Sequence, residues 1–503
     1  MSNIRVTYSG LISFTISIAS VFTGLIFTII VTRRLTPDEF GTWALIGTLI
    51  GYFLISEKII SFWTTRQIAR NEDVGKTSIA SSLFFSLLSI PVYLLVSYAV
   101  SETSNADLDT LLFGVFLIPV HFLSQTLAGI NRGFKPQLTG YGLLVFETMK
   151  IPGALSLVFF LELGVEGAII SVTLAYVVSI IVQGYLARQK LKAKFKKSVL
   201  KRWFKLSWLP GYSHIATPLL KSDIVIYSII SGSVIGVAYF SISMTIALLI
   251  LHAQMITQAL YPKLLAKGGP EYIKENYTLL MYFSIPLFGL AIIFSKPGLF
   301  ALNPVYEFVY PVVIILAFKT FFLVLRESFG QILRGIETVD IVQNPKFSHL
   351  LKSKLFFVPS VRLVQAIIFV AVITTTFLIL NNLGATEIEI VTWWAIIVLG
   401  LEIPFFIYML IQVQRNVEFS FPFIKTAKYF GATLAFVLVF FVTSNYLISY
   451  EISIYDFLPG VIYQVIICVA VYLGLTYIID EKTRTIFKGV INEIRSKSSS
   501  SNN

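Results

Sequence analysis

Several ionisable side chains lie inside long apolar stretches of the sequence, where a bilayer-spanning helix would hold them away from water. Glu147 and Lys150 have helical i, i+3 spacing, so they share a helix face and can form an internal ion pair or line a cavity wall. Lys221 and Asp223 have i, i+2 spacing, so they point to different sides, and each needs a partner on another helix or a water-filled cavity. Lys319 lies well inside a further apolar stretch. Because an ionised side chain at bilayer depth costs at least ~2.5 kcal/mol, these residues are functional candidates.

Other ionisable residues have a simpler interpretation. Arg326, Glu327 and Arg362 are nearer to the ends of apolar stretches, where a long side chain can extend its charge to the interface. Three histidines are interpreted as interior or interface residues rather than as proton relays, namely His121, His214 and His252. For Glu402 the sequence favours neither a proton site nor a structural ion pair.

Motifs for other chemistry are missing from the sequence. The single cysteine, Cys468, excludes an internal disulfide framework and any metal site built on several cysteines. The four histidines are scattered without paired spacing, and no GxGxxG, Walker A or GxSxG motif occurs. The sequence therefore predicts no cofactor, no metal and no catalytic residue.

The elements that must position the charged candidates are membrane-spanning helices. The chain has 503 residues, of which 56% are hydrophobic and only 13% are charged, whereas about 25% of the residues of a soluble domain are charged. A spanning helix needs about 20 apolar residues, and we place about fourteen such spans. They lie near 9–31, 40–57, 79–100, 110–130, 141–161, 164–187, 208–231, 235–259, 278–296, 306–326, 356–380, 389–412, 426–448 and 457–479.

The net charge of +12 follows the predicted loops. If the N-terminus is cytoplasmic, the inside loops hold most of the Lys and Arg residues, with the densest block between Arg188 and Lys205, and the outside loops are acidic. Only Arg33, Arg34 and Lys296 depart from this pattern. We therefore expect both termini in the cytoplasm and no nucleic-acid binding. The outside loops are too short for a catalytic domain.

A weak internal repeat divides the chain near the basic block. Residues 35–44 read LTPDEFGTWA and residues 231–240 read SGSVIGVAYF, and both place Gly and an aromatic residue at the start of a helix. Repeats of this kind are common in secondary transporters. We predict an N-terminal bundle with its basic loop at 1–205, a second bundle at 206–425, and two further helices with a polar tail at 426–503.

Three motifs resemble a known family. Residues 34–41 read RLTPDEFG and are similar to the R-x-L-x-P-x-x-F/Y-G turn of the polysaccharide-biosynthesis (Wzx-like) flippases of the multidrug/oligosaccharidyl-lipid/polysaccharide exporter superfamily. Residues 163–170, LGVEGAII, resemble the turn before span six of that family. Residues 222–227, SDIVIY, followed by Gly236 and Tyr239, resemble the opening of its second half. These motifs mark turns and helix packing, not a substrate.

The resemblance implies an all-α integral membrane fold with two pseudo-symmetric six-helix bundles facing a central cavity and two extra C-terminal helices. It also implies the transfer of a lipid-linked oligosaccharide from the cytoplasmic to the outer leaflet of a prokaryotic plasma membrane. Membrane lipids and glycan assembly enzymes are the other expected partners. On this reading the substrate phosphates contact the cationic residues of the candidate set, and two acidic residues act as charge pairs or coupling residues. The cationic residues are Lys150, Lys221, Lys319 and Arg34, and the acidic residues are Glu147 and Asp223. For Arg34 a packing or capping role in the turn, with Asp38 or Glu39, is an equal alternative.

Other functions remain open at this point. An ion-coupled small-molecule or multidrug exporter could share the architecture, but a cation exporter should have an acidic cavity, and the intramembrane charges here are mainly basic. A membrane glycan polymerase or glycosyltransferase would need a larger outside loop. A scaffold or assembly role is a further alternative.

Overall fold

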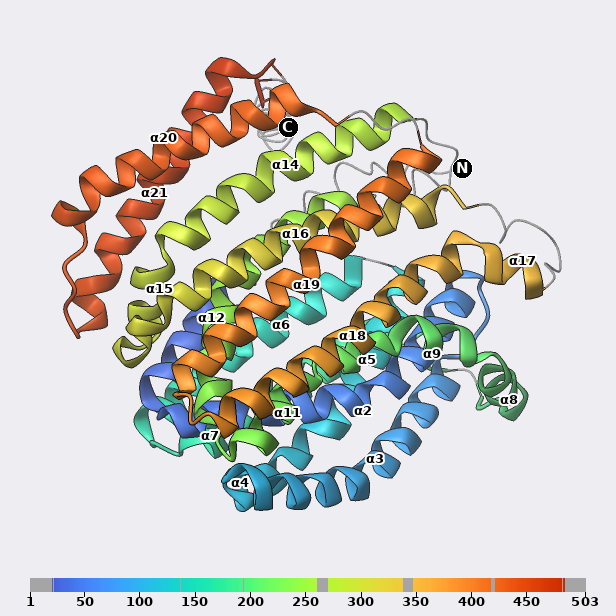
Figure 1. The fold of residues 1–503 in the computed structure, drawn as a ribbon. Coiled ribbons are helices and arrows are strands. Elements are labelled where there is room, and N and C mark those ends of the chain that lie inside the picture. The colour runs from blue at the N-terminus through green and yellow to red at the C-terminus, as the bar shows by residue number, and fades with distance from the viewer. Residues whose placement is uncertain are drawn as a thin grey trace, which may run out of the picture. The chain divides into compact units, whose positions relative to one another are not determined.

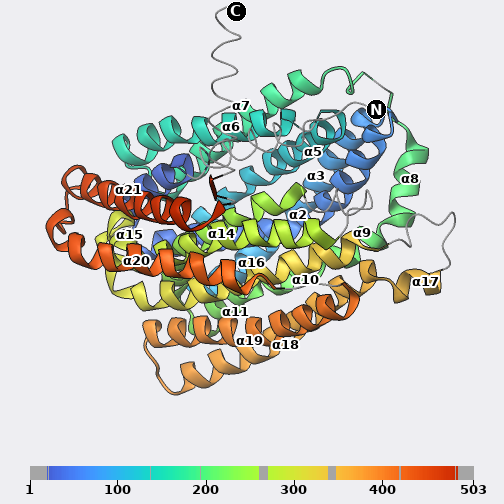
Figure 2. The same ribbon diagram turned by 90° about the horizontal axis from the view of Figure 1, so that it is seen from above.

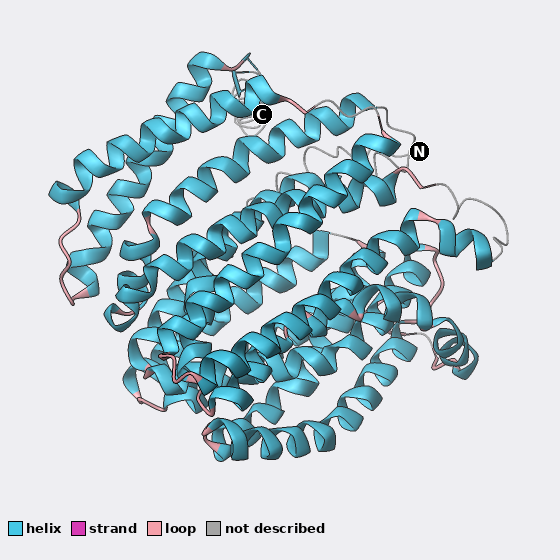
Figure 3. Cartoon of the chain, in the orientation of Figure 1, coloured by secondary structure: helices cyan, strands magenta, loops and turns pink. Residues whose placement is uncertain are grey.

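The computed structural model describes residues 20, 22–135, 137–192, 194–259, 270–337, 347–417, 421–481 and 483–484. All regular elements within these ranges are helices, and no strand occurs among them (Figure 3). The prediction of an all-α fold is therefore confirmed.

Twelve helical segments in the described ranges are long and apolar enough to cross a bilayer. They correspond to twelve of the predicted spans, and the predicted span at 164–187 coincides with the helix Gly164–Ala187. Much of the first predicted span, 9–31, lies outside the described residues. Residues 22–34 are described, and they are helical. The chain is a multi-pass membrane protein, and the count of fourteen spans stays a prediction.

The described chain forms two compact units, Met1–Thr245 with Glu337–Phe405 and Ile246–Ile336 with Phe406–Asn503. The first unit, unit 1, contains most of the N-terminal helices (Figure 1). Its elements are α2 (Pro37–Ala69), α3 (Gly75–Ser104), α4 (Leu108–Phe113), η1 (Gly114–Phe116), α5 (Leu117–Phe134), α6 (Gln137–Ala154), η2 (Leu155–Phe160), α7 (Gly164–Ala187), α8 (Lys197–Leu206), α9 (Trp208–His214), α10 (Ala216–Leu219), α11 (Ser222–Ser231), most of α12 (Ile235–Ala247), α17 (Phe347–Lys352), α18 (Lys354–Asn382) and most of α19 (Glu387–Asn416).

The second unit, unit 2, contains the remaining helices. They are η3 (Leu248–Ala259), α14 (Pro270–Ile293), α15 (Ser295–Leu302), η4 (Pro304–Val309), α16 (Tyr310–Gly335), α20 (Phe423–Leu447) and α21 (Ile454–Ile479). The last two helices lie side by side (Figure 2), and α20 also packs against α14. Tyr472 on α21 donates a 2.6 Å hydrogen bond to the Tyr282 carbonyl of α14. A polar contact therefore also joins α21 to α14. The predicted division of the chain at 205 and 425 stays a prediction.

One predicted span is not a continuous helix. The segment 208–231 forms three short helices, α9, α10 and α11, so the expectation of an unbroken span was wrong. Pro218 lacks a backbone N–H and restricts the residue before it, and Lys221 leaves the helical conformation at φ −110° and ψ 3°. The Tyr52 hydroxyl on α2 donates a 3.0 Å hydrogen bond to the Lys221 carbonyl at the break.

The family-like turn at residues 34–41 positions α2 within unit 1. Thr36 caps the helix, Pro37 occupies its first turn, and the Glu39 carboxylate accepts a 2.8 Å hydrogen bond from the Thr36 N–H, which completes a capping box. Gly41 lies so close to the turn before α12 that a Cβ there would be only 2.1 Å from the Val234 carbonyl oxygen. The prediction that this motif serves turn formation and helix packing is confirmed.

Candidate functional site

Three basic side chains of unit 1 lie close together. They are Lys58 on α2, Lys221 at the junction of α10 and α11, and Arg362 on α18, and we call them the cationic cluster. Lys58 is near enough to Lys221, Arg362 and the adjacent Glu57 for their charges to act on its ammonium group. Lys58 and Lys221 form no ion pair within the part of the chain that the structure describes. A concentration of basic side chains attracts a polyanion.

Contacts around the cluster fix its backbone elements. The rings of Tyr212 on α9 and Phe356 on α18 stack with centroids 4.7 Å apart, and the Tyr212 and Ser360 hydroxyls are hydrogen-bonded at 2.6 Å. Tyr52 joins α2 to the carbonyl of Lys221. The three segments that carry the cations are therefore tied together by contacts that do not involve the cationic groups themselves.

The position of Lys58 along α2 gives its expected depth in the bilayer. Lys58 lies about 20 residues, or ~30 Å, beyond the start of α2, which is about the thickness of the hydrocarbon core. Lys58 and Arg362 are half-buried, whereas Lys221 is exposed. If Pro37 marks the outer end of α2, as the predicted topology requires, Lys58 is at the level of the cytoplasmic leaflet.

Asp223 lies in an aromatic environment beside the broken helix. It is buried, and its Oδ2 accepts a 2.9 Å hydrogen bond from the Trp394 indole N–H of α19. Trp394 is fully buried and stacks on Phe240 of α12 with ring centroids 3.8 Å apart. Asp223 and Lys221 form no mutual ion pair, as their spacing predicted, and Asp223 is one of the contacts that hold α11. Its predicted coupling role stays a prediction.

Glu147 and Lys150 form a second charged group in unit 1. Their ion pair measures 2.6 Å, and only 11% of the Lys150 side chain and 13% of the Glu147 side chain are exposed. Thr23 donates a 3.4 Å hydrogen bond to Glu147, and the Lys150 ammonium lies 5.1 Å from the ring centroid of Phe27. This is the internal salt bridge that the i, i+3 spacing predicted. A substrate-binding role for Lys150 stays a prediction.

Arg34 has a different partner from the expected one. Its guanidinium lies 2.9 Å from the Glu162 carboxylate and 4.2 Å from the ring centroid of Phe159. The expectation of Asp38 or Glu39 as its partner was wrong, because Glu39 is used in the capping box and Glu162 comes close from the turn before α7. A phosphate contact by Arg34 stays a prediction.

Lys319 lies on α16 of unit 2 and is half-buried. Lys150 and Lys221 belong to unit 1, and the residues that contact Lys150 differ from those that contact Lys221. The predicted grouping of Lys150, Lys221 and Lys319 around one cavity therefore stays a prediction.

The sequence analysis missed two members of the cationic cluster. Lys58 was placed just beyond a predicted span, but α2 continues to Ala69, so the residue lies within a helix. Arg362 was interpreted as an interfacial side chain. The signal that could have revealed both is Lys221, a cation at a proline-interrupted span, but its neighbours are distant in the sequence.

Glu402 accepts a 3.1 Å hydrogen bond from Gln365, and His121 lies 3.2 Å from the Tyr176 hydroxyl. Within the described ranges, no group of three or more His, Cys, Asp or Glu side chains is arranged to hold a metal.

Comparison with known proteins places the chain in a family. The family model described as "Polysaccharide biosynthesis protein" matches residues 7–267, which confirms the resemblance found in the turn motifs. No curated protein matches the chain.

Several solved structures share the fold at low sequence identity. A structure described as lipid II flippase MurJ in an inward closed conformation is 15% identical, covers 93% of this chain and 98% of its own, and has a TM-score of 0.63. An inward-facing multidrug resistance MATE family transporter of the MOP superfamily is 14% identical, covers 81% of this chain and 98% of its own, and has a TM-score of 0.57. The MATE multidrug transporter DinF-BH is 16% identical, covers 82% and 96%, and has a TM-score of 0.58. These likenesses establish an all-helical membrane-transporter fold.

Proposed function

The chain belongs to the polysaccharide biosynthesis protein family, and we propose that it is a flippase that moves a polyprenyl-pyrophosphate-linked oligosaccharide from the cytoplasmic to the outer leaflet. The membrane is the plasma membrane of a prokaryote, both termini are cytoplasmic, and the product serves cell-surface polysaccharide or glycoprotein synthesis. The structural relatives are transporters, and the chain performs no covalent chemistry on its substrate. One of those relatives is described as a flippase of lipid II, which supports a lipid-linked substrate.

The cationic cluster is the observation that carries this proposal. A pyrophosphate group is anionic over a wide pH range, and Lys and Arg side chains bind phosphate oxygens through charge-assisted hydrogen bonds. Lys58 and Lys221 form no ion pair in the described ranges, so neither ammonium is held by a carboxylate within bridging distance. Their position near the cytoplasmic level of unit 1 suits the capture of a head group that is made on the cytoplasmic side.

The broken helix supplies a physical basis for movement at this site. Backbone in a bilayer is interrupted only where protein or water satisfies the freed polar groups, and discontinuous helices commonly form the substrate sites of transporters. The break at Lys221 lies within the cluster, and the Tyr52 hydroxyl donates a hydrogen bond to the carbonyl of the same residue. On binding, the pyrophosphate relieves the repulsion among the three cations, so the loaded state tolerates a closure that the empty state resists. Alternating access then carries the head group and glycan across while the prenyl tail stays in lipid.

A second candidate function is an ion-coupled small-molecule exporter. It is favoured by Glu57, a carboxylate on α2 that is only 2% exposed and accepts hydrogen bonds from Ser61 and Thr126. A buried carboxylate with hydroxyl donors can exchange a proton during transport. The adjacent cluster is basic, however, and would repel a cationic drug.

The proposed function is tested by lipid analysis of cells depleted of the protein. Accumulation of the complete lipid-linked oligosaccharide in the cytoplasmic leaflet is expected. Normal lipid-linked pools would overturn the proposal and direct attention to drug efflux. Complete units stranded in the outer leaflet would also overturn it and would indicate a polymerase or transferase.

Binding by purified protein tests the site itself, with farnesyl pyrophosphate as the probe and farnesol as its uncharged counterpart. A hydrogen bond to a charged group contributes about 1.5–3 kcal/mol, so K58Q and K221Q should each weaken farnesyl pyrophosphate binding by about tenfold or more. K76Q removes an exposed lysine on α3 and is the matched control. Equal binding of farnesol, or an equal loss in K76Q, would refute the cluster as the pyrophosphate site.

A further inference from the structure

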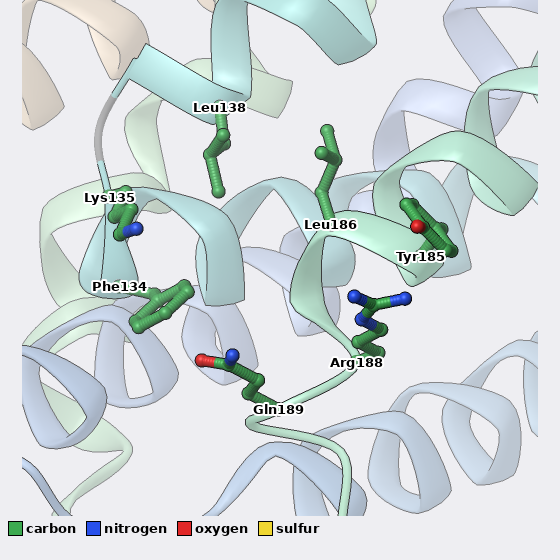
Figure 4. Close-up of a pocket in the computed structure, with 7 residues that line it drawn as sticks. All are labelled: Phe134, Lys135, Leu138, Tyr185, Leu186, Arg188 and Gln189. Carbon is green, nitrogen blue, oxygen red and sulfur yellow. The ribbon is translucent and has the colours of Figure 1, made fainter.

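A separate pocket lies where the ends of α5, α6 and α7 meet, at the end of unit 1 that is predicted to face the cytoplasm (Figure 4). Its volume is about 190 Å³. Lys135 and Arg188 stand on opposite sides of it, and Leu138 and Leu186 form an apolar part of its lining. None of these residues belongs to the cationic cluster.

The two cations of this pocket keep their charge for a ligand. Neither Lys135 nor Arg188 forms an ion pair with any residue in the described ranges. Both contact aromatic faces instead, because the Arg188 guanidinium lies 4.3 Å from the ring centroid of Tyr185 and the Lys135 ammonium lies 5.3 Å from that of Phe134. These contacts orient the cations without neutralising them.

The surroundings of the pocket have the composition of a membrane interface. Tyr185 is 63% exposed, as is typical of the aromatic side chains that lie at head-group level. The short helix α8 follows α7 and buries Trp203 in a cluster that includes Ala187, the residue before Arg188. The other face of α8 exposes Phe204 together with lysines, which is the pattern of a helix lying in the interface plane.

We propose that this pocket binds the head group of an anionic phospholipid of the cytoplasmic leaflet. Lys135 and Arg188 hold the phosphate from opposite sides, and the exposed ring of Tyr185 with Leu138 and Leu186 contacts the glycerol and the start of the acyl chains. Basic pockets between the cytoplasmic ends of membrane helices are suited to such head groups. The assignment is independent of the transported substrate, because it shares no residue with the cationic cluster.

Lipid binding to the full-length protein in a neutral detergent tests this proposal. Phosphatidylglycerol is titrated, and the first bound lipid is followed by native mass spectrometry. At about 1 kcal/mol for each basic residue, the double variant K135Q/R188Q should bind phosphatidylglycerol about thirtyfold more weakly. The matched control K192Q/K194Q removes two exposed lysines from the loop that follows and should bind like the unmodified protein.

Two further ligands distinguish the sources of the phosphate. Phosphatidylcholine has the same phosphate without net charge and should bind weakly, and inorganic phosphate at millimolar concentration should not displace phosphatidylglycerol. Displacement by inorganic phosphate would overturn the lipid assignment in favour of a free-phosphate site. Equal losses in K135Q/R188Q and K192Q/K194Q would overturn it in favour of non-specific charge. Loss of farnesyl pyrophosphate binding in K135Q/R188Q would also overturn it, because the pocket would then belong to the transported substrate.

Discussion

Substituting Gly41 by alanine should destabilise the protein through one close backbone contact. The added Cβ would lie 2.1 Å from the Val234 carbonyl oxygen and 2.8 Å from the Val234 carbonyl carbon, whereas ordinary van der Waals contact begins at 3.4 Å. Backbone atoms, not a flexible side-chain end, make this contact. The turn before α12 and the start of α2 must therefore separate by about an ångström before the methyl group fits.

The size of the effect follows from two opposing contributions. Alanine is favoured over glycine inside a helix by about 0.5–1 kcal/mol. Forcing an extra carbon into a well-packed contact costs about 1–3 kcal/mol. Gly47 on the same helix has no atom within 4 Å of its added Cβ, so G47A receives only the favourable contribution. The gain from alanine is common to both variants, so we expect the free energies of unfolding of G41A and G47A to differ by the contact cost of about 1–3 kcal/mol, with G41A the less stable variant.

Reversible unfolding in mixed detergent micelles, followed by tryptophan fluorescence, measures this difference directly. The comparison holds the helix, the substitution and the detergent constant, so only the local contact differs. If G41A is as stable as G47A, the close approach of α2 to Val234 is wrong, and with it our explanation for glycine at the end of the RLTPDEFG turn. A G41A protein that is destabilised but still binds farnesyl pyrophosphate would leave the cationic cluster unaffected.

Two buried polar contacts give further predictions. W394F removes the indole donor to Asp223 and should lower the free energy of unfolding by about 1–3 kcal/mol. The control W393F, at a neighbouring position that is 50% exposed, should have little effect in the same unfolding titration. Equal effects of the two substitutions would show that the hydrogen bond does not contribute to stability. E147Q leaves Lys150 buried without its ion-pair partner and should cost about 3–5 kcal/mol, and the double variant E147Q/K150M should recover most of this loss. If the double variant also flips substrate normally in proteoliposomes, the predicted substrate-binding role of Lys150 is wrong; if it is as unstable as E147Q, the destabilisation does not come from the unpaired lysine.

Much of the fold could be predicted because a bilayer imposes a simple rule on sequence. Every span must satisfy its backbone internally, so long apolar runs become helices, and α7 coincides with its predicted span. The same rule explains the error at 208–231. Hydropathy records whether a residue tolerates lipid, and it does not record whether each backbone group has a partner. Pro218 signalled a missing backbone donor, but the Tyr52 hydroxyl that contacts the break comes from a distant part of the sequence.

The candidate site was predictable only where its contacts are local. Helical geometry alone brings Glu147 to Lys150, and the predicted ion pair forms. The surroundings of Lys221 depend instead on how α2 and α18 pack against a broken helix, and spacing along the chain contains no information about that packing. The partner of Arg34 illustrates the same limit, because the nearby acidic residues were obvious in the sequence, but the distant Glu162 makes the contact.

The energetics of the cationic cluster support our proposal that it has a functional role. A break within a membrane helix gives up backbone hydrogen bonds, and like charges placed together repel, so neither feature stabilises the empty protein. Both occur at Lys221, which is the point where a packing role would favour an unbroken helix with an apolar side chain. The aromatic contacts of Trp394 and Tyr212 hold the segments around the break in place, so the arrangement is supported rather than loosely folded. A site whose cations repel one another gains most from an anionic ligand, and this gain should disappear when Lys58 and Lys221 lose their charge.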